Sequence, residues 1–517
     1  MRLALHIFKK DARRLWWEVA VTLGVLAMLT HLDSTRADAI PGPMEGLLNL
    51  LLPAVWIYLV AVLIHEEALV GNRQFWVTRP YPSMVLLGAK VLFLLAFIHI
   101  PSLVADFIIV TARGFQPLNF LPSLLWKQAL LAGAVTLPAA ALAAVTRSLT
   151  QFVPFAVLLA AAAGALAGNL YLVQPWIRVD EVRWAIVLIV IATGALTILV
   201  LQYAVRRTRA SRVLGLAAAA TAGLLFVYLP RDSTVSIACA LSGRHSDSPT
   251  VSIAFAAARG PLPEAWVPQW PGSSGQFALP VSISGLTENL NQVMLDQLRF
   301  EISIPGQERW TMSALPPTGS PPTDPVGARI WPMYGKGWWK MIRVDRAVYD
   351  RIIDVPVTLT GKIAANLFHE SEPVSIPVSP EARSVPGIGR CSSILADDGR
   401  GREMLKILCE SPSRLPLGTR VALTHPERGA LRPRSLGDGG NFLSYPGWAW
   451  LSPLERRQTF FHLTEESGRG STSLVPDTAL SDAKVELTRL ELERCTIFNY
   501  ELRNVVLRDF VTRHPRP

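Results

Sequence analysis

Up to about residue 230 the chain consists of long apolar runs with few charged residues, and this feature constrains its fold more than any other. A hydrocarbon layer about 30 Å thick needs roughly 20 apolar residues of helix to cross it, because backbone polar groups must be satisfied within the helix there. The sequence therefore predicts an α-helical polytopic membrane domain over residues 1–230, with about seven transmembrane helices. The expected spans are residues 15–32, 46–65, 84–111, 124–146, 152–173, 184–204 and 212–229.

The basic residues of this half lie in clusters beside the apolar runs. The whole chain is half hydrophobic by count, has 17% charged residues and carries a formal net charge of +10. Positive charge alone could indicate a nucleic-acid partner, but clusters at the ends of apolar runs are typical of membrane orientation. Since no nucleic-acid-binding motif occurs either, we expect a lipid bilayer and no nucleic acid as partner.

The distribution of Lys and Arg in the short loops predicts the orientation, because such residues favour the cytoplasmic side. A cytoplasmic N-terminus places most of them inside, and seven crossings then place the C-terminal region outside. We therefore expect a multi-pass protein of the cell (inner) membrane with an extracytoplasmic C-terminal region. A cleaved signal peptide is an alternative for the first run, since Ala37-Asp38-Ala39 resembles a cleavage site, and it would leave the rest of the topology unchanged.

The residues ahead of the first span, MRLALHIFKKDARRLWW, place Leu3, Ile7 and Leu15 among basic residues. This pattern favours a helix that lies flat on the inner membrane surface. An ordinary cytoplasmic tail is the alternative.

Ionisable residues within the apolar runs are costly and often functional. His99 and Asp106 are seven residues apart and so share one face of the third span, which makes them a candidate intramembrane polar site for a proton or a substrate. Alternatively, the span ends near Pro101 and leaves Asp106 at the outer interface. Lys90 and Lys127 lie near helix ends, where we expect their ammonium groups to reach the membrane surface.

The loop EEALVGNRQFWVTRPYPS (66–83) separates the second and third spans. Its acids suit a helix start, Leu69, Phe75 and Trp76 share an apolar face, and Pro80 and Pro82 stop a helix. We therefore expect a short amphipathic helix over residues 66–78, with an irregular interfacial loop as the alternative.

The run from Glu66 through Gly71, Arg79 and Pro80 to Lys90 resembles the pattern of type-2 ATP-binding-cassette (ABC) exporter permeases. The surface helix, the helical core and the basic RRTRASR after the sixth span fit that family as well. The resemblance covers roughly residues 1–210. It implies that the loop is a coupling helix that docks on a separate ATP-binding subunit, and that two permeases, identical or different, form the complex. The residues expected to couple are Glu66, Glu67, Arg73, Trp76, Arg79 and Pro80.

Signs of catalysis are absent from the sequence. GKGWWK at 335–340 lacks the spacing and the hydroxyl of a phosphate loop, no G-x-S-x-G occurs, and the histidines show no metal-ligand spacing. We expect no enzymatic activity, no metal and no cofactor in this chain.

Beyond residue 230, short alternating runs such as TVSIACAL, LRFEISI and EMLKILC are separated by turn-rich pieces. Such punctuation is typical of β-sandwiches. We expect an all-β, sandwich-like extracytoplasmic region with one domain over 231–384 and a second over 385–517.

All four cysteines lie in this half, as an oxidising compartment would favour. Cys391 and Cys409 flank DDGRGR, and a turn at residues 399–401 would place them opposite each other on a hairpin. This pairing is favoured, with Cys239 and Cys495 left for a second bond; buried free thiols are the alternative.

Two functions follow from these patterns. The first is the permease subunit of an ABC-type transporter, which couples ATP hydrolysis by a separate subunit to substrate export. The second is a membrane-anchored extracytoplasmic β-domain protein with a sensory, adhesive or accessory binding role and no transport.

Overall fold

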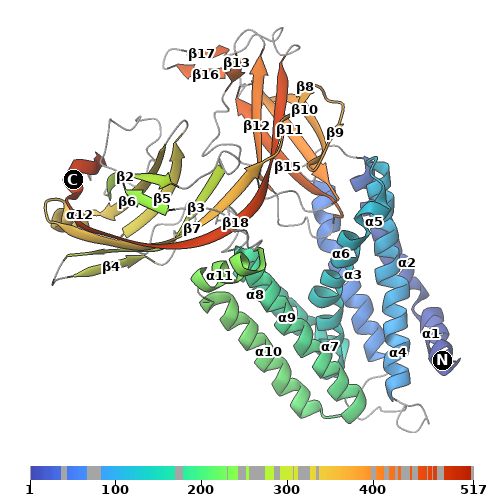
Figure 1. The fold of residues 1–517 in the computed structure, drawn as a ribbon. Helices are drawn as coiled ribbons and strands as arrows, with labels where there is room; N and C mark the ends of the chain where they lie inside the picture. Colours follow the sequence, from blue (N-terminus) through green and yellow to red (C-terminus); the bar gives the residue numbers. More distant parts are fainter. Residues whose placement is uncertain are drawn as a thin grey trace. The chain divides into compact units, whose positions relative to one another are not determined.

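The fold consists of an N-terminal helical region followed by a β-rich region (Figure 1). It comes from a computed structural model, which describes residues 2–35, 43–66, 83–168, 179–229, 231–242, 252–255, 274–284, 292–304, 306, 308–312, 326–333, 337–397, 403–412, 418–425, 429–431, 443–444, 452–462, 464–467, 470–473 and 483–513. The chain divides into two compact units. The first comprises Met1–Leu166, Trp184–Val227 and Pro373–Arg489, and the second comprises Ala167–Arg183, Tyr228–Glu372 and Leu490–Pro517.

The helical region contains helices long and apolar enough to cross a membrane, and these indicate a membrane protein. Within the described residues there are five such helices, or up to six if a bent N-terminal pair forms one span. The five are Gly46–His65, Met84–Ala112, Pro117–Val145, Val182–Val205 and Thr208–Phe226. A shorter apolar helix, Leu149–Leu159, lies between the third and fourth of them.

The individual helices follow the apolar runs of the sequence closely. Their bounds are α1 (Arg2–Arg14), α2 (Trp16–Thr35), α3 (Pro43–His65), α4 (Ser83–Leu94), α5 (Ile100–Ala112), α6 (Leu121–Leu131), α7 (Leu137–Val145), α8 (Leu149–Gly168), α9 (Val179–Val200) and α10 (Thr208–Tyr228). The packed interior of this bundle is almost entirely aliphatic and aromatic, with Trp56, Phe93 and Leu59 among its fully buried side chains.

Two of the long helices contain a π-helical turn near their middle. The turn η2 (Leu95–His99) joins α4 to α5, and η4 (Ala132–Thr136) joins α6 to α7. A proline follows each turn, Pro101 after η2 and Pro138 after η4, and its missing N–H explains why the regular hydrogen-bond ladder is interrupted there. Such turns are frequent at functional sites.

The first unit also contains a two-layer β-domain, formed by residues 373–489 and called here the proximal β-domain. One layer has the order β14-β15-β11-β10-β9, and the other contains β13, β12, the start of β18 and β8. Cys391, Ile407, Val421 and Val485 are among the buried side chains between the layers. The strand bounds are β8 (Val374–Pro377), β9 (Arg383–Val385), β10 (Gly389–Asp397), β11 (Glu403–Ser411), β12 (Gly418–His425), β13 (Gly429–Leu431), β14 (Leu443–Ser444) and β15 (Glu455–His462), with a separate hairpin of β16 (Thr464–Ser467) and β17 (Gly470–Ser473).

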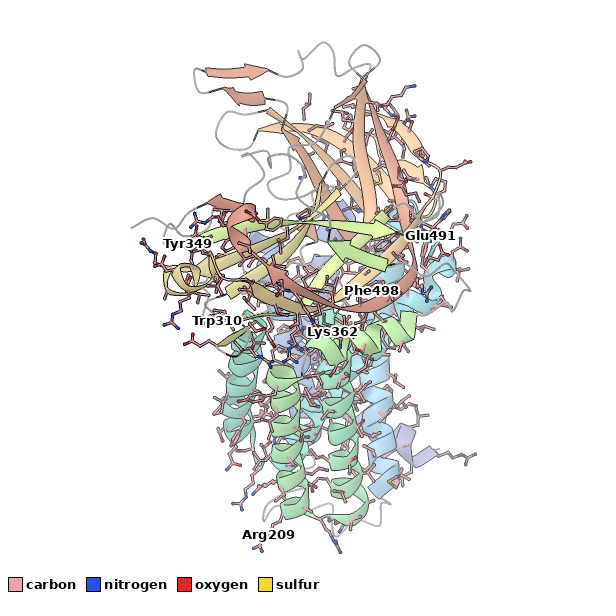
Figure 2. The ribbon with its side chains drawn as sticks, turned by 60° about the vertical axis from the view of Figure 1, so that its left-hand side comes forward. Arg209, Trp310, Tyr349, Lys362, Glu491 and Phe498 are labelled. Atoms are coloured by element: carbon pink, nitrogen blue, oxygen red, sulfur yellow. A yellow bond between two sulfur atoms is a disulfide. The ribbon has the colours of Figure 1, made fainter. Side chains whose placement is uncertain are left out.

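The second unit is a sandwich of two antiparallel sheets. One sheet has the order β1-β2-β6-β5, with β19 beside β2, and the other contains β18, β7, β3 and β4. Lys362 of β7 is paired with Asn499 of β18, next to Phe498 (Figure 2). Phe277 and Ile342 of one sheet meet Phe300 and Leu359 of the other in the core. The bounds are β1 (Ser252–Phe255), β2 (Ser274–Ser284), β3 (Gln292–Ser303), β4 (Arg309–Met312), β5 (Val326–Met333), β6 (Gly337–Asp345), α12 (Arg346–Ile352), β7 (Val357–Glu370), β18 (Lys484–Val505) and β19 (Val511–Arg513).

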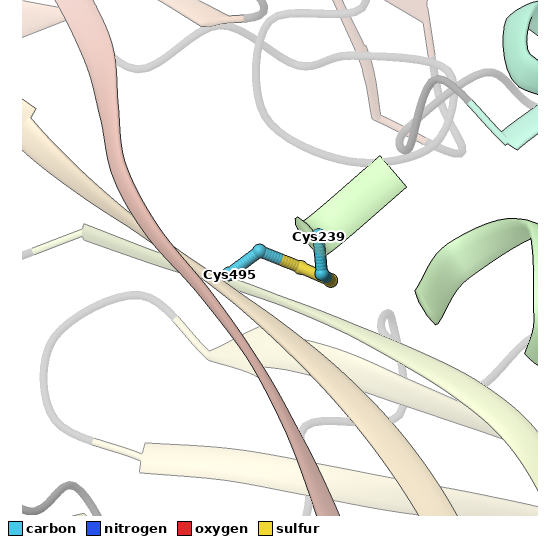
Figure 3. Close-up of a disulfide and its surroundings, with 2 residues drawn as sticks. All are labelled: Cys239 and Cys495. Carbon is cyan, nitrogen blue, oxygen red and sulfur yellow. A yellow bond between two sulfur atoms is a disulfide. The ribbon is translucent and has the colours of Figure 1, made fainter. Parts of the chain in front are cut away.

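The run TVSIACAL is helical, whereas its alternation predicted a strand. It lies in α11 (Arg231–Ser242), where Val235 and Cys239 are four residues apart and share one helix face. Val235 is fully buried against Ala364 and Ile497, and Cys239 is disulfide-bonded to Cys495 of β18 (Figure 3). Short apolar runs fit both periodicities, and here packing on the sheet selects the helix.

Cys391 and Cys409 form the other disulfide, as the hairpin argument favoured. They are direct partners in the register of β10 and β11, and both are fully buried. Two disulfides are consistent with an oxidising compartment for the β-rich region.

We predict that replacing Cys391 and Cys409 together by Ala lowers the free energy of unfolding of the proximal β-domain by about 3 kcal/mol, because the crosslink closes a short loop in the unfolded chain. Amide hydrogen exchange on β10 and β11 measures this. The matched control, Cys239→Ala with Cys495→Ala, lies in the other unit and should leave exchange on β10 and β11 unchanged. Unaltered protection in the Cys391/Cys409 variant would contradict the prediction.

Candidate functional site

Three groups of polar side chains, most of them buried, stand out from the apolar interior of the first unit. We call them the mid-helix cluster (His99, Ser102, Asp106, Lys127, Gln128 and Thr136), the domain-contact cluster (Asp33, Arg113, Arg390, Glu410, Ser452 and Arg456) and the α1 anchor (Asp11, Arg14, Glu66 and Lys90). Each joins elements that are distant in the sequence.

An ion pair lies at one end of the mid-helix cluster. Asp106 is 2% exposed and its Oδ1 lies 2.5 Å from Lys127 Nζ. Gln128 Nε2 donates to Asp106 Oδ2 over 3.2 Å and lies 3.3 Å from Ser102 Oγ. The α-helix continues past Pro101 to Ala112, so Asp106 is inside it and not beyond its end. Lys127 is directed to Asp106 and does not extend to the surface as expected, because a buried carboxylate needs a counter-charge.

His99 lies at the other end of the same cluster. Its Nδ1 is 3.3 Å from Gln128 Oε1 and its Nε2 is 3.4 Å from Thr136 Oγ1. The carboxylate of Asp106 can only accept, so the Gln128 amide turns its nitrogen to Asp106 and its oxygen to His99. Nδ1 of His99 therefore carries a proton and donates it to Gln128. Both His99 and Thr136 are the last residues of π-helical turns, η2 and η4.

This arrangement lets the imidazole hold one proton or two without leaving a polar group unsatisfied. Thr136 Oγ1 lies 3.4 Å from His99 Nε2 and also 3.3 Å from the carbonyl oxygen of Ala132. With a neutral ring, the Thr136 hydroxyl donates to Nε2. With a charged ring, Nε2 donates to the hydroxyl, which turns its own hydrogen to Ala132. A chain of hydrogen bonds thus runs from Thr136 through His99 and Gln128 to the Asp106–Lys127 pair.

The domain-contact cluster joins the ends of α2 and α5 to the proximal β-domain. Arg456 of β15 lies between two carboxylates, with Nη2 2.5 Å from Asp33 Oδ1 and Nε 2.9 Å from Glu410 Oε1. Ser452 Oγ donates to Asp33 Oδ2 over 2.9 Å. The side chains of Asp33, Glu410 and Arg456 are 5%, 10% and 11% exposed. Their charges are therefore stabilised mainly by one another, since little water reaches them.

Arg113, which follows α5, adds a second arginine to this cluster. Its Nη2 donates to the backbone oxygen of Asp33 over 2.7 Å, and its Nη1 is 3.9 Å from Glu410 Oε1. Arg390 of β10 in turn donates to the backbone oxygen of Arg113 and, over 3.1 Å, to that of Ala382. Nearby, Leu454 packs with Ile109, Val110 and Leu124 in a small apolar core. Helices and β-domain are therefore held by a buried interface that combines charged and apolar contacts.

The α1 anchor ties the first helix to the start of the loop that the sequence singled out. Lys90 Nζ lies 2.8 Å from Asp11 Oδ2, and both residues are almost completely buried. Lys90 therefore does not reach the surface, contrary to expectation. Arg14 pairs with Glu66, which directly follows α3. The axis of α1 is bent by 75° from that of α2.

Of the residues predicted to couple to an ATPase, only Glu66 lies in the described part of the chain. Glu67, Arg73, Trp76, Arg79 and Pro80 lie outside it, as does the amphipathic helix expected over residues 66–78.

Sequence reasoning singled out His99 and Asp106 but missed Gln128, Ser102 and Thr136, which connect them. A signal was available in Lys127-Gln128, two adjacent polar residues inside an apolar run. The domain-contact cluster gave no such signal, because Asp33 and Arg456 are separated by 423 residues.

Comparison with protein-family models, with curated proteins and with solved structures finds no match to this chain.

We predict that Arg456→Gln destabilises the full chain by about 3 kcal/mol, because it leaves the buried carboxylates without their shared counter-charge. Thermal unfolding of the detergent-solubilised protein measures this. Adding Asp33→Asn to Arg456→Gln should restore part of the loss, and a double variant no more stable than Arg456→Gln would contradict the coupling. The exposed Arg346→Gln serves as the control and should have little effect.

We also predict that Lys127→Met lowers the yield of folded protein far more than Asp106→Asn with Lys127→Met together, because only the single change leaves an unpaired carboxylate in the bundle. Size-exclusion profiles after extraction measure the folded fraction. Equal yields for the two variants would exclude a charge pair at this position.

Proposed function

We propose that the chain is the permease subunit of an ABC-type transporter, in which a separate ATP-binding subunit hydrolyses ATP and this chain moves the substrate outward. The observation that carries the proposal is the α1 anchor. Glu66, at the start of the loop expected to couple, is paired with Arg14, and Lys90, near the start of the next long helix, is paired with Asp11. A push on the loop would therefore reach α1 and α4 through charge pairs.

The route from this anchor into the bundle follows a single long helix. Met84–Ala112 carries Lys90 near one end and His99, Ser102 and Asp106 farther along. Because η2 interrupts its hydrogen-bond ladder directly before His99 and Ile100, this helix has a natural place to bend. We propose that closure of the ATP-binding subunits bends it there and rearranges the mid-helix cluster, which would then contact a polar group of the substrate.

We propose the membrane topology that the basic residues predicted. Seven crossings, formed by α2, the five long helices and α8, put the N-terminus in the cytoplasm and the β-rich region outside the cell membrane. The disulfides in the β-rich region support its placement outside the cell membrane, because disulfides form in oxidising compartments. The resemblance to exporter permeases supports a complex of two permeases, as a homodimer or a heterodimer. The β-domains would bind the substrate or a partner.

The non-transport function, an anchor for a binding or sensory β-domain, needs no ATPase. Co-purification with an ATP-binding subunit therefore separates the two functions. We expect that subunit to associate with the full chain and to hydrolyse ATP faster in the complex.

Neutralising Glu66, Glu67 and Arg73 together to Gln should weaken this association by about tenfold, as expected for a loss near 1.4 kcal/mol. Affinity measurements and ATPase rates on detergent-solubilised complexes test this. A matched neutralisation of two exposed acids and one exposed arginine in the second unit, Glu308, Asp350 and Arg346, should change neither. If no ATP-binding subunit associates, or if the loop variant behaves like the control, the permease function is excluded.

A further inference from the structure

The side of α1 that faces away from the bundle carries several cations and no carboxylate. Arg2, Lys9 and Arg13 are exposed, and their spacings of seven and four residues place them on one helix face. We propose that this face, called here the α1 basic face, binds the phosphate headgroups of anionic phospholipids.

The opposite side of α1 is fixed against the bundle. Ile7 and Asp11, four residues apart, are buried, and Phe8 packs against Phe93 and Phe97. Lys9 lies two residues from both Ile7 and Asp11, which is 200° of helix rotation, so it points away from the contact. A helix packed on its inner side by protein presents its outer side to whatever surrounds the bundle at that level.

Ion pairing inside the protein removes the negative charge from this helix. Asp11 is the only acid in α1, and it is buried against Lys90 with Lys10 Nζ 3.6 Å from its other oxygen. Arg14 is occupied by Glu66. Across the ranges that the structure describes, neither Arg2 nor Lys9 nor Arg13 has an acidic partner. The exposed side of α1 therefore carries three cations and no anion.

The junction with α2 places this face at the level of lipid headgroups. Trp16 and Trp17 are the first residues of α2 and are both 62% exposed, and such rings favour the membrane interface. The 75° bend between α1 and α2 lays α1 across the direction of the span instead of along it. A helix at this level with long basic side chains can place its charges among the phosphates while their stems cover apolar surface.

Charge complementarity selects anionic over zwitterionic lipid. Each Lys or Arg near an anionic surface contributes about 1 kcal/mol of attraction. Three such residues on one rigid face would favour a phosphatidylglycerol (PG) headgroup over phosphatidylcholine (PC) by roughly a hundredfold in affinity. That this face lies in the cytoplasmic leaflet rests on the proposed function, but the preference for anionic lipid does not.

The test compares lipid binding to the purified, delipidated full chain by native mass spectrometry and by the shift of its thermal unfolding temperature. Titration with PG is expected to give bound lipid and a stabilising shift, and titration with PC is expected to give much less of both. Arg2→Gln with Lys9→Gln and Arg13→Gln should lower PG affinity roughly a hundredfold and leave PC binding unchanged.

The matched control removes the same charge elsewhere on the first unit. Arg147, Arg207 and Arg209 are exposed at other helix ends, Arg209 at the start of α10 (Figure 2). Their triple change to Gln should keep most of the PG preference. Equal PG and PC affinity in the unchanged chain, full PG binding in the α1 variant, or equal losses in variant and control would each overturn the proposal. If the triple variant misfolds, Lys9→Gln and Arg13→Gln as single changes must each weaken PG binding.

Discussion

A charge in apolar surroundings needs a partner, and this requirement organises the first unit. Removing a carboxylate or an ammonium group from water costs several kcal/mol, and only a close opposite charge with further hydrogen bonds offsets that cost. The bundle meets the requirement three times, at Asp11 with Lys90, at Asp106 with Lys127 and at Asp33 with Arg456. Each pair joins separate elements. The first two fix which helix lies beside which in a core where aliphatic contacts alone would permit several arrangements, and the third fixes the β-domain on the helix ends.

The three pairs also differ in what surrounds them, and the difference suggests different tasks. Asp11 and Lys90 hold a peripheral helix in place. Asp33 and Arg456 share a network with Glu410 and Arg113 that fastens a folded β-domain to helix ends. Of the three, only the Asp106 pair continues, among the described residues, into a chain of further hydrogen-bonding side chains that carry no fixed charge, Gln128, His99 and Thr136. The Thr136 hydroxyl can donate either to His99 or to the carbonyl of Ala132. Among the three pairs, only the described surroundings of Asp106 include a group, the imidazole of His99, that can gain or lose a proton while its neighbours stay hydrogen-bonded.

Local patterns in the sequence predicted the helical region and much of the β-rich region. Burial in lipid or in a sandwich requires apolar residues in long runs or at regular intervals, and both are visible in the sequence. The pairing of Cys391 with Cys409 followed from a hairpin only 18 residues across. The helix α11 was mistaken for a strand because eight residues fit both periods. The partners of Lys90, Lys127 and Asp33 were out of reach for a different reason. Charge pairing depends on tertiary proximity, and a single sequence carries no record of which distant residue supplies the opposite charge.

The helix α5 takes part in two of the three clusters through one face. Ser102 and Asp106 belong to the mid-helix cluster, and Arg113, seven residues beyond Asp106, belongs to the domain-contact cluster. A slide of α5 by one helical turn, about 5.4 Å, would break both sets of contacts together. A bend at η2, which precedes α5, would leave the contacts of Arg113 in place. The β-domain therefore fixes the position of α5 along its axis, and any motion of the bundle that keeps these contacts has to leave α5 in place.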